Sequence, residues 1–423
     1  MPDGKLKQAV EAYFTDLRLV RGSGGATDER SLYVPLANLL NAVGGSLRPK
    51  VFCVQDLANQ GAGHPDFGLY TTRQVQKGKP KSGQKPERGV IEVKPVADDA
   101  WLTAASNQVT GYWKEYRQVL ATNLRDFVLV GEDPAGNPVR LESFRLASSA
   151  AEFDAKLARP RAFANEVGAG LVEYLIRVLS HGVSLTEPRD VAWLLASYAR
   201  DGLARVERAG DAAALTVLRE ALEGSLGVRF EGDRGAAFFR STLVQTLFYG
   251  VFSAWVLWAR QVPTPTGAFN WREAVWHLRA PVLRALFQQL SDPGRLQPLG
   301  LVEVLDWTAV ALNRVERESF FDKFGEGEAV PYFYEPFLQA FDPELRKQLG
   351  VWYTPSEVVR YMVARVDKAL KDDLGIADGL AGENVYVLDP CCGTGAYLAE
   401  ALRRIAANLE GKGLGALTGA RVK

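Results

Sequence analysis

The feature that most constrains this chain is a glycine-rich turn that separates an apolar, strand-like segment from a helical one. The segment VYVL (385–388) runs directly into Asp389-Pro390-Cys391-Cys392-Gly393-Thr394-Gly395, and AYLAEALRRI (396–405) follows with helical spacing of its apolar residues. Glycines at such a turn let a ligand touch the backbone, and the first turn of the helix presents N–H groups without intrahelical partners. The turn therefore predicts a nucleotide-like ligand, with a purely structural glycine turn as the alternative.

Length and composition indicate an ordinary globular protein of several domains. At roughly 100 to 200 residues per domain, 423 residues predict about two to four domains. A hydrophobic share of 47% with 24% charged residues excludes collagen-like, coiled-coil and wholly disordered chains. Lys plus Arg equals Asp plus Glu at 50 each, which argues against a uniformly basic nucleic-acid coat but leaves room for local basic patches.

Cysteines and histidines are few, and their placement limits the chemistry. The cysteines are Cys53 and the adjacent pair Cys391 and Cys392, which cannot form a disulfide framework, so a reducing, cytoplasmic compartment is expected. Three histidines lie far apart and no Cys-x-x-Cys occurs, so zinc has no visible ligand set. Any metal is expected to be held by oxygen.

One segment raises the question of a membrane span. Ser241–Ala259 runs 19 residues without a charge. It contains Gln245, Thr246 and Ser253, and it lies within an otherwise helical region, so we expect a buried core helix and no membrane association. The N-terminal segment MPDGKLKQAVEAYF carries scattered charges, and no secretory signal is expected.

The chain is predicted to be a multidomain α/β protein in three parts. Residues 1–147 read as mixed α/β, residues 148–329 as an all-helical connector, and residues 330–423 as the beginning of a further α/β domain. A single strand–turn–helix unit cannot make a sheet, so this last domain is expected to be incomplete as written. Within the first part, the sequence predicts the following elements: helices over 5–19, 27–45 and 106–120, and strands over 51–57, 66–72, 89–95 and 127–132.

Candidate catalytic residues lie on two of these predicted strands. In Ile91-Glu92-Val93-Lys94, the period of two puts Glu92 and Lys94 on one face, where Asp66 of a neighbouring strand can join them. Two carboxylates and a backbone carbonyl, such as that of Val93, suffice to place a hydrated Mg²⁺ beside a phosphate. Lys94 is suited to positioning or deprotonating the attacking water. A surface ion pair at the edge of a sheet is the alternative.

This arrangement resembles the active site of the PD-(D/E)XK nuclease superfamily, with Pro65-Asp66 and Glu92-x-Lys94 in that family's order. The resemblance implies a Mg²⁺-dependent endonuclease that acts on double-stranded DNA, with Asp66 and Glu92 as metal ligands. It also implies that Lys94 is catalytic.

Three further residues extend the resemblance. Gln108-x-x-x-Tyr112 is similar to a motif of some members of the superfamily, and a spacing of four puts both side chains on one helical face. Glu29 resembles the acidic residue that many such folds carry on an early helix. The family implies that all three side chains point at the same site.

A basic stretch, TTRQVQKGKPKSGQKPERG (71–89), connects the two catalytic strands. Six of its side chains are basic and Glu87 is its one acid, and a net charge of about +5 beside the proposed metal could neutralise DNA phosphates. Its glycines, prolines and serine equally suit a flexible solvated loop, and both readings remain open. The basic residues are Arg73, Lys77, Lys79, Lys81, Lys85 and Arg88.

The glycine turn at 389–395 resembles motif I of the amino-group DNA methyltransferases, which bind S-adenosylmethionine. The resemblance implies that Gly393 and Gly395 supply backbone contact surface, and that the carboxylate of Asp389 meets the ammonium of the donor. The methyl-transfer motif of the family, Asn/Asp-Pro-Pro-Tyr/Phe, does not occur in this sequence after the turn.

A second methyltransferase motif lies upstream. Residues 350–359, GVWYTPSEVV, resemble motif X, which precedes motif I in the γ arrangement of N-6 adenine enzymes. Thr354 to Glu357 also reads as a capping box with Pro355 at the first helical position. The resemblance implies that Thr354 meets the carboxylate of the donor and that Tyr353 packs on its adenine.

Taken together, the order of these parts is similar to single-chain restriction-modification enzymes of the type IIG and type ISP kind. No G-x-x-x-x-G-K-[ST] occurs, which favours the IIG-like arrangement. The resemblance implies phage defence, double-stranded DNA as partner and possible further defence subunits. The alternatives are a methyltransferase-only protein whose nuclease-like domain is an inert DNA-binding module, and a truncated product without activity.

Overall fold

The structure, a computed structural model, describes residues 4–22, 29–55, 57, 63–77, 79–133, 136–261, 265–324, 333–343, 354–392 and 395–410, without the side chains of residues 29 and 30. The chain divides into two compact units. The first contains Met1–Ser184 and Ser197–Val315, and the second contains Leu185–Ala196 and Glu316–Lys423.

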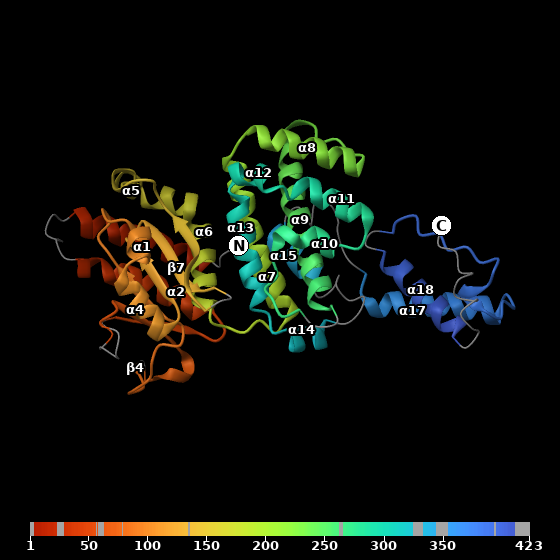
Figure 1. The fold of residues 1–423 in the computed structure, drawn as a ribbon, viewed down its shortest axis with the longest axis horizontal. Coiled ribbons are helices and arrows are strands. Elements are labelled where there is room, and N and C mark those ends of the chain that lie inside the picture. The colour runs from red at the N-terminus through yellow and green to blue at the C-terminus, as the bar shows by residue number, and fades with distance from the viewer. Residues whose placement is uncertain are drawn as a thin grey trace. The chain divides into compact units, whose positions relative to one another are not determined.

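The first unit opens with a mixed α/β part, coloured red to yellow-green in Figure 1. Its elements, in chain order, are α1 (Gly4–Gly22), η1 (Glu29–Leu32), α2 (Tyr33–Ser46), β1 (Val51–Gln55), β2 (Phe67–Thr71), η2 (Thr72–Gln74), β3 (Val75–Gln76), β4 (Lys79–Pro80), β5 (Val90–Val93), α3 (Ala100–Ala104), α4 (Asn107–Tyr116), β6 (Val119–Thr122), β7 (Asp126–Glu132), β8 (Pro138–Arg145), α5 (Ala150–Leu157) and α6 (Pro160–Ser180).

A mixed sheet forms the centre of this part. Among the described residues it has six strands in the order β1-β2-β5-β6-β7-β8, and a separate two-stranded ribbon pairs β3 with β4. β5 and β6 pair in parallel, whereas the other neighbours in the sheet are antiparallel. The parallel pair needs a crossover connection, which α3 and α4 provide.

Side chains alternate between two buried faces of the sheet, as the period of two requires. On β5, Ile91 and Val93 join the core under α1, α2 and α6, whereas Val90 joins the core under α3 and α4. Because Glu92 shares the face of Val90, it points toward α4.

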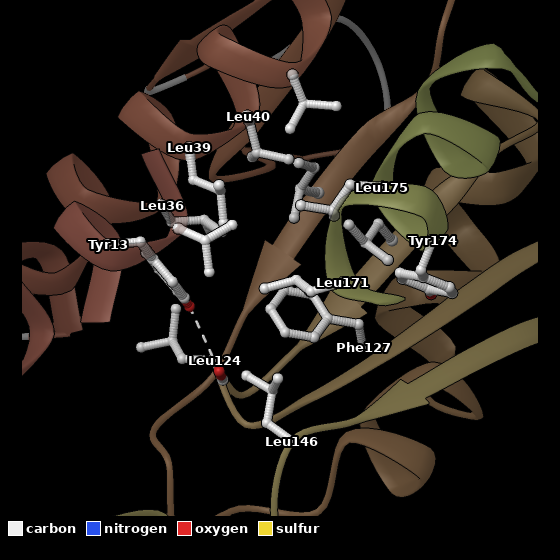
Figure 2. Close-up of a cluster of buried hydrophobic side chains, with 14 of the residues drawn as sticks. Tyr13, Leu36, Leu39, Leu40, Leu124, Phe127, Leu146, Leu171, Tyr174 and Leu175 are labelled. Atoms are coloured by element: carbon white, nitrogen blue, oxygen red, sulfur yellow. Dashed lines mark hydrogen bonds between the residues drawn. The ribbon is translucent and has the colours of Figure 1, made fainter. Parts of the chain in front are cut away.

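The larger core packs helices against the first face of the sheet (Figure 2). Tyr13 of α1, Leu36 of α2, Phe127 of β7 and Leu171 of α6 all belong to it, and the Tyr13 hydroxyl donates to the Leu124 carbonyl at 3.4 Å. Each large apolar side chain buried here stabilises the fold by roughly 1.5–3 kcal/mol. Residues on both sides of the predicted boundary at 147/148 therefore contribute to one core.

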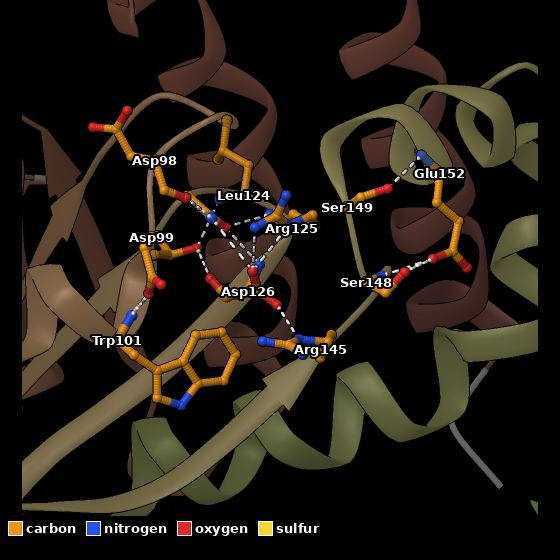
Figure 3. A network of polar contacts seen from close by, with 12 residues as sticks. Asp98, Asp99, Trp101, Leu124, Arg125, Asp126, Arg145, Ser148, Ser149 and Glu152 are labelled. Atoms are coloured by element: carbon orange, nitrogen blue, oxygen red, sulfur yellow. Dashed lines mark hydrogen bonds and ion pairs between the residues drawn. The ribbon is translucent and has the colours of Figure 1, made fainter.

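A buried carboxylate organises the turn between β6 and β7 (Figure 3). The side chain of Asp126 is 0% exposed and accepts from Arg145 Nε and Arg125 Nε, both at 2.9 Å. The guanidinium of Arg145 also lies 4.3 Å from the ring centre of Trp101, at the start of α3. Two cations compensate the buried charge, and the network fixes α3 against the end of the sheet.

The structure of this part departs from the sequence prediction at the end of α4 and at β8. The helix predicted over 106–120 ends at Tyr116, because Arg117 adopts a left-handed conformation with φ of 61°, and Val119 then enters β6 opposite Val90. Gly44 and Gly45 lie inside α2. Gly44 is needed there for close approach, since a Cβ would lie 2.2 Å from the Val51 carbonyl oxygen. Strand β8 was not predicted.

The rest of the first unit is helical, as predicted for the connector. The helices that follow are α7 (Pro188–Arg208), which crosses the division between the units, α8 (Ala213–Leu226), α9 (Gly232–Ala259), η3 (Trp271–Glu273), α10 (Ala274–His277), α11 (Pro281–Leu290), α12 (Pro293–Leu296), η4 (Gln297–Leu299) and α13 (Leu301–Asn313). Within the described ranges, α9 alone is long and apolar enough to cross a membrane, and 61% of its apolar window is buried. It packs against α8, α10 and α11.

In the second unit, two helices pack side by side. Its elements are α14 (Arg317–Lys323), α15 (Glu335–Phe341), α17 (Ser356–Asp372), η6 (Gly379–Ala381) and α18 (Ala396–Leu409). Tyr397 at the start of α18 donates to Met362 Sδ at 3.1 Å, and Asn408 at its end donates to Asp367 Oδ1 at 2.7 Å. The earlier residue of α18 contacts the earlier residue of α17, and the later residue contacts the later one. The two helices therefore run parallel.

The strand predicted over VYVL (385–388) is not formed. Among the described residues of this unit no strand is present, and the segment has no regular secondary structure, with Tyr386 84% and Leu388 85% exposed. A strand needs a neighbour for its backbone N–H and C=O groups, and the described residues offer none here. The predicted strand–turn–helix is therefore an irregular segment, a turn and a helix.

Candidate functional site

Asp66 lies directly before β2, beside the end of β5. The register of these strands places it across from Glu92. Its Oδ2 accepts a hydrogen bond from the Val93 N–H at 2.7 Å, and its Oδ1 accepts one from the Tyr33 hydroxyl at 2.6 Å. Two donors from two different elements therefore hold this carboxylate in one orientation.

Glu92, Lys94, Gln108 and Tyr112 converge as the sequence predicted. Lys94 Nζ donates to Glu92 Oε1 at 2.6 Å, and Gln108 Nε2 donates to the same oxygen at 2.8 Å. Gln108 Nε2 also lies 3.0 Å from the Tyr112 hydroxyl. The Glu92 side chain is 4% exposed and β5 is an interior strand, so the alternative of a surface ion pair at a sheet edge is wrong.

The electrostatics of Tyr112 place both carboxylates in one environment. Burial raises the pKa of the Tyr112 hydroxyl, and the negative charges of Glu92 and Asp66 raise this pKa further, whereas Gln108 and Lys94 oppose the rise. Charges act at this strength only over short distances through a partly buried medium. The five side chains thus form a single polar cluster, which we call the carboxylate cluster.

One predicted residue of this site cannot be assessed, and one contributing residue was not predicted. The side chain of Glu29 lies outside the described part of the chain, and its predicted role stays a prediction. Tyr33 was missed, although it follows Glu29 by four residues and begins α2. A spacing of four from a predicted acidic residue is a local signal that could have identified it.

The donors in the carboxylate cluster suit a hard cation. Asp66 and Glu92 provide carboxylate oxygens, which Mg²⁺ prefers, and this ion keeps several waters when two carboxylates bind it. No group of three or more His, Cys, Asp or Glu side chains that could hold a metal occurs within the described ranges. The fit therefore depends on these two carboxylates and on backbone or water oxygens.

The basic stretch is folded around Gln74, which is 1% exposed. Its side-chain oxygen accepts from the Thr71 and Glu87 N–H groups, both at 3.2 Å, and its Nε2 donates to the Lys85 carbonyl at 2.5 Å. These bonds close the stretch into an ordered loop that carries the β3–β4 ribbon. For the described residues, these hydrogen bonds favour a folded loop over the alternative of a flexible solvated one.

The six basic residues of this stretch fall into two groups. Arg73 pairs with Glu87, Lys85 pairs with Glu115, and Arg88 is buried, so these three are engaged within the fold. The other three are exposed, and the described residues offer them no ion pair; they are Lys77, Lys79 and Lys81. We call these three the ribbon lysines.

The glycine turn at the start of α18 carries an oriented carboxylate. Asp389 Oδ1 accepts from the Cys391 N–H at 3.2 Å, whereas its buried Oδ2 has no hydrogen-bond partner within the described residues. Gly395 precedes α18 with φ of 75°, a conformation that favours glycine. A buried acceptor at a helix N-terminus is suited to a ligand with a positively charged donor group.

The structure positions the other predicted cofactor residues in part. Thr354 is exposed before α17, and Pro355 takes the N-cap position without a side-chain cap, so the predicted capping box is wrong. Because α17 and α18 run parallel, the N-terminal ends of both helices face the same direction. Tyr353 and Gly393 lie outside the described residues, and their roles stay predictions.

Comparison with known proteins gave two similarities and one negative result. The chain resembles a solved cryo-EM structure of a DrdV–DNA complex, with 18% identity and a TM-score of 0.38, over 96% of this chain and 36% of that one. No curated protein matched the sequence. Residues 326–419 match the family model of the N-6 DNA methylases, and this segment contains the glycine turn and both parallel helices.

Proposed function

We propose that this chain belongs to a restriction-modification protein in which a Mg²⁺-dependent DNA endonuclease is joined to an S-adenosylmethionine-dependent N-6 adenine DNA methyltransferase. The match of residues 326–419 to the N-6 DNA methylases carries the methyltransferase part. The carboxylate cluster carries the nuclease part, which we assign to the PD-(D/E)XK superfamily. The protein acts on double-stranded DNA in the cytoplasm, in phage defence, alone or with further subunits.

In the nuclease, Asp66 and Glu92 would hold Mg²⁺, which supplies Lewis acidity and an activated water when bound. Gln108 and Lys94 both donate to Glu92 Oε1 and so fix the direction of that carboxylate. The Lys94 side chain is 31% exposed, whereas that of Glu92 is 4% exposed. The Lys94 ammonium is placed to orient an attacking water and to exchange a proton with solvent at Nζ.

The ribbon lysines provide the contact with DNA. The chain has no net charge, so attraction to phosphate has to come from a local patch. The ribbon follows β2, which begins next to Asp66, and its three exposed ammonium groups have no competing carboxylates among the described residues. Phosphate contacts of this kind position a duplex without reading its sequence.

In the methyltransferase, the donor supplies an electrophilic methyl group, and this chain supplies part of its binding site. The buried Oδ2 of Asp389 is suited to accept from the ammonium of the donor. The N-terminal ends of α17 and α18 offer N–H groups and a positive dipole end toward its carboxylate, with the Thr354 hydroxyl as a further donor.

A second candidate is a methyltransferase whose nuclease-like part only binds DNA. The observation that favours it is the small donor set, since the described residues bring only two carboxylates together at the carboxylate cluster. In this case the ribbon lysines would hold DNA and the carboxylate cluster would be structural.

Two assays on the intact protein test the proposal. Transfer of a labelled methyl group from S-adenosylmethionine to adenine in duplex DNA is expected, and its absence would contradict the methyltransferase assignment. Supercoiled DNA is expected to be cut with Mg²⁺ and to survive with a chelator. Tight DNA binding without cleavage at any Mg²⁺ concentration would favour the second candidate.

A further inference from the structure

Tyr33 contacts the Asp66 carboxylate from one side of the sheet, whereas Gln108 and Tyr112 lie on the other side. Tyr33 belongs to the core under α1, α2 and α6, whereas Tyr112 belongs to the core under α3 and α4. The Tyr33 side chain is buried, at 6% exposure, and its hydroxyl reaches Asp66 Oδ1 at 2.6 Å. Asp66 therefore lies where the two layers meet, and Tyr33 is its contact with the first layer.

The position of Tyr33 is fixed by packing. Its ring lies 5.1 Å from that of Phe67, the fully buried residue that follows Asp66. Further along α2, the Asn41 side chain donates to the Cys53 carbonyl at 3.1 Å and accepts from the Cys53 N–H at 2.9 Å. This pair of bonds ties the helix to the edge strand β1, and β1 pairs with β2. This packing and these hydrogen bonds hold the Tyr33 hydroxyl in place beside Asp66.

We propose that Tyr33 is a positioning residue that orients the Asp66 carboxylate toward a divalent cation. The inference rests on the nuclease function proposed above. One donor on each oxygen, Tyr33 on Oδ1 and Val93 on Oδ2, fixes the rotation of the carboxylate about its last bond. Each oxygen keeps a further lone pair for a metal ion.

A hydroxyl that donates to a carboxylate at this distance makes a strong, charge-assisted bond. When Tyr33 is changed to Phe, the ring keeps its packing against Phe67 and the hydrogen bond to Asp66 is lost. Of the donors Tyr33 and Val93, only the Val93 N–H then remains, and the Asp66 carboxylate can rotate. Loss of a group that orients a metal ligand typically weakens metal binding by roughly 10- to 100-fold.

Tyr13→Phe is the matched control for Tyr33→Phe. Both tyrosines are buried in the same core, and each donates one hydroxyl hydrogen bond, but that of Tyr13 goes to the Leu124 carbonyl away from the carboxylate cluster. Urea unfolding of both variants is expected to give similar midpoints, which separates a loss of packing from a loss of positioning.

The first measurement is calorimetric titration of the intact protein with Mn²⁺, without DNA. Tyr33→Phe is expected to weaken Mn²⁺ binding by roughly 10-fold or more, with Tyr13→Phe unchanged. The second is the Mg²⁺ dependence of DNA cleavage. Here the half-saturating Mg²⁺ concentration is expected to rise, and excess Mg²⁺ is expected to restore the maximal rate.

The outcomes separate the inference from the function on which it rests. Wild-type Mn²⁺ affinity in Tyr33→Phe would overturn the role of Tyr33, provided that Glu92→Gln abolishes binding. If wild type and Glu92→Gln bind Mn²⁺ equally, the proposed metal site itself fails. If Tyr13→Phe weakens binding as much as Tyr33→Phe, the effect is one of core stability and the positioning role is overturned.

Discussion

Two ion pairs of the α/β part differ in how deeply their carboxylates are buried. The Glu92 side chain is 4% exposed beside Lys94, whereas that of Glu87 is 31% exposed beside Arg73. An exposed pair is worth roughly 0–1 kcal/mol, whereas a buried carboxylate is costly to keep charged unless its partners stay in place. Burying the charge of Glu92 is thus unfavourable for stability, and a purely structural role would not require it.

Replacing Glu92 by Gln is expected to abolish Mg²⁺-dependent cleavage. The amide keeps the size of the side chain but removes a metal ligand, and loss of a ligand should exceed the roughly 100-fold effect of losing a supporting group. Glu87→Gln is the matched control and is expected to cleave at nearly the wild-type rate. A time course on supercoiled DNA measures both, and wild-type cleavage by Glu92→Gln would remove the carboxylate cluster from the mechanism.

His181 gives a prediction for the pH dependence of stability. Burial and, to a smaller extent, the positive charge of Arg314, 3.1 Å from its Nδ1, together lower the pKa of His181 to about 3. The unfolded chain, with a His pKa near 6.5, binds this proton more readily. The stabilisation is therefore complete above about pH 6.5 and is lost as the pH falls toward 3.

We accordingly expect the free energy of unfolding to fall between pH 6.5 and pH 4, with His181 contributing at most roughly 1.4 kcal/mol per pH unit. His181→Gln removes the titrating group and should flatten this dependence. His64→Gln, at an exposed position, is the control. Urea titrations at several pH values measure the slope, and an unchanged slope in His181→Gln would assign the acid sensitivity to other groups.

Among the elements, the β3–β4 ribbon gives the sharpest separation between structural and solvent-facing charges. Gln74 ties the loop together, and Arg73 and Lys85 are paired on its flanks. The ribbon lysines project from this ordered base. An ordered base limits the entropy lost on binding DNA, which a disordered loop would have to lose.

Changing Lys77, Lys79 and Lys81 to Ala together is expected to weaken DNA binding and to flatten its salt dependence. Each lost phosphate contact reduces the log–log slope by about 0.9, so the three together reduce it by roughly 2.7. Lys85→Ala, whose ammonium already pairs with Glu115, should change the slope by less than one contact. Equal slopes for wild type and the triple variant would show that the ribbon faces away from DNA.

Local patterns predicted most helices and strands because burial follows the helical or strand period. The period failed at 117–120, where a left-handed Arg117 ends α4 and the apolar residues Val119 and Leu120 start β6 instead. Periodicity alone cannot distinguish a buried strand from the last turn of a buried helix. The strand β8 was missed because its first residues are exposed and its pattern is mixed.

Within the carboxylate cluster, the pairs inside one element could be predicted, whereas a contact between elements could not. Glu92 with Lys94, and Gln108 with Tyr112, could be predicted because each pair is separated by one period of its own element. The contact of Tyr33 with Asp66 spans 33 residues and depends on how α2 packs on β1. The spacing of four from Glu29 could have identified Tyr33 as a candidate residue. The packing that brings its hydroxyl to Asp66 is a property of the assembled sheet and leaves no periodic signal in the sequence.

At the scale of the whole molecule, a buried polar network ties the sheet to the helices within the first unit. Arg177 of α6 and Glu142 of β8 are 2% and 4% exposed and pair at 2.9 Å, and Tyr198 of α7 donates to the other Glu142 oxygen at 2.5 Å. Removing one member would leave a buried charge without its main partner, at a cost of roughly 3–5 kcal/mol. The α/β part and these helices should therefore unfold together.

The last prediction concerns the proposed site for the methyl donor. Asp389→Asn removes the negative charge that would meet the ammonium of the donor, and Gly393→Val places a branched side chain where the donor is predicted to approach the backbone. Both changes are expected to abolish S-adenosylmethionine binding in calorimetry. Asp372→Asn, at an exposed carboxylate that pairs with Lys368, should bind normally. If Asp389→Asn and Gly393→Val bind the donor as tightly as Asp372→Asn does, the turn is only a structural corner, and the cofactor assignment fails even if the nuclease assays succeed.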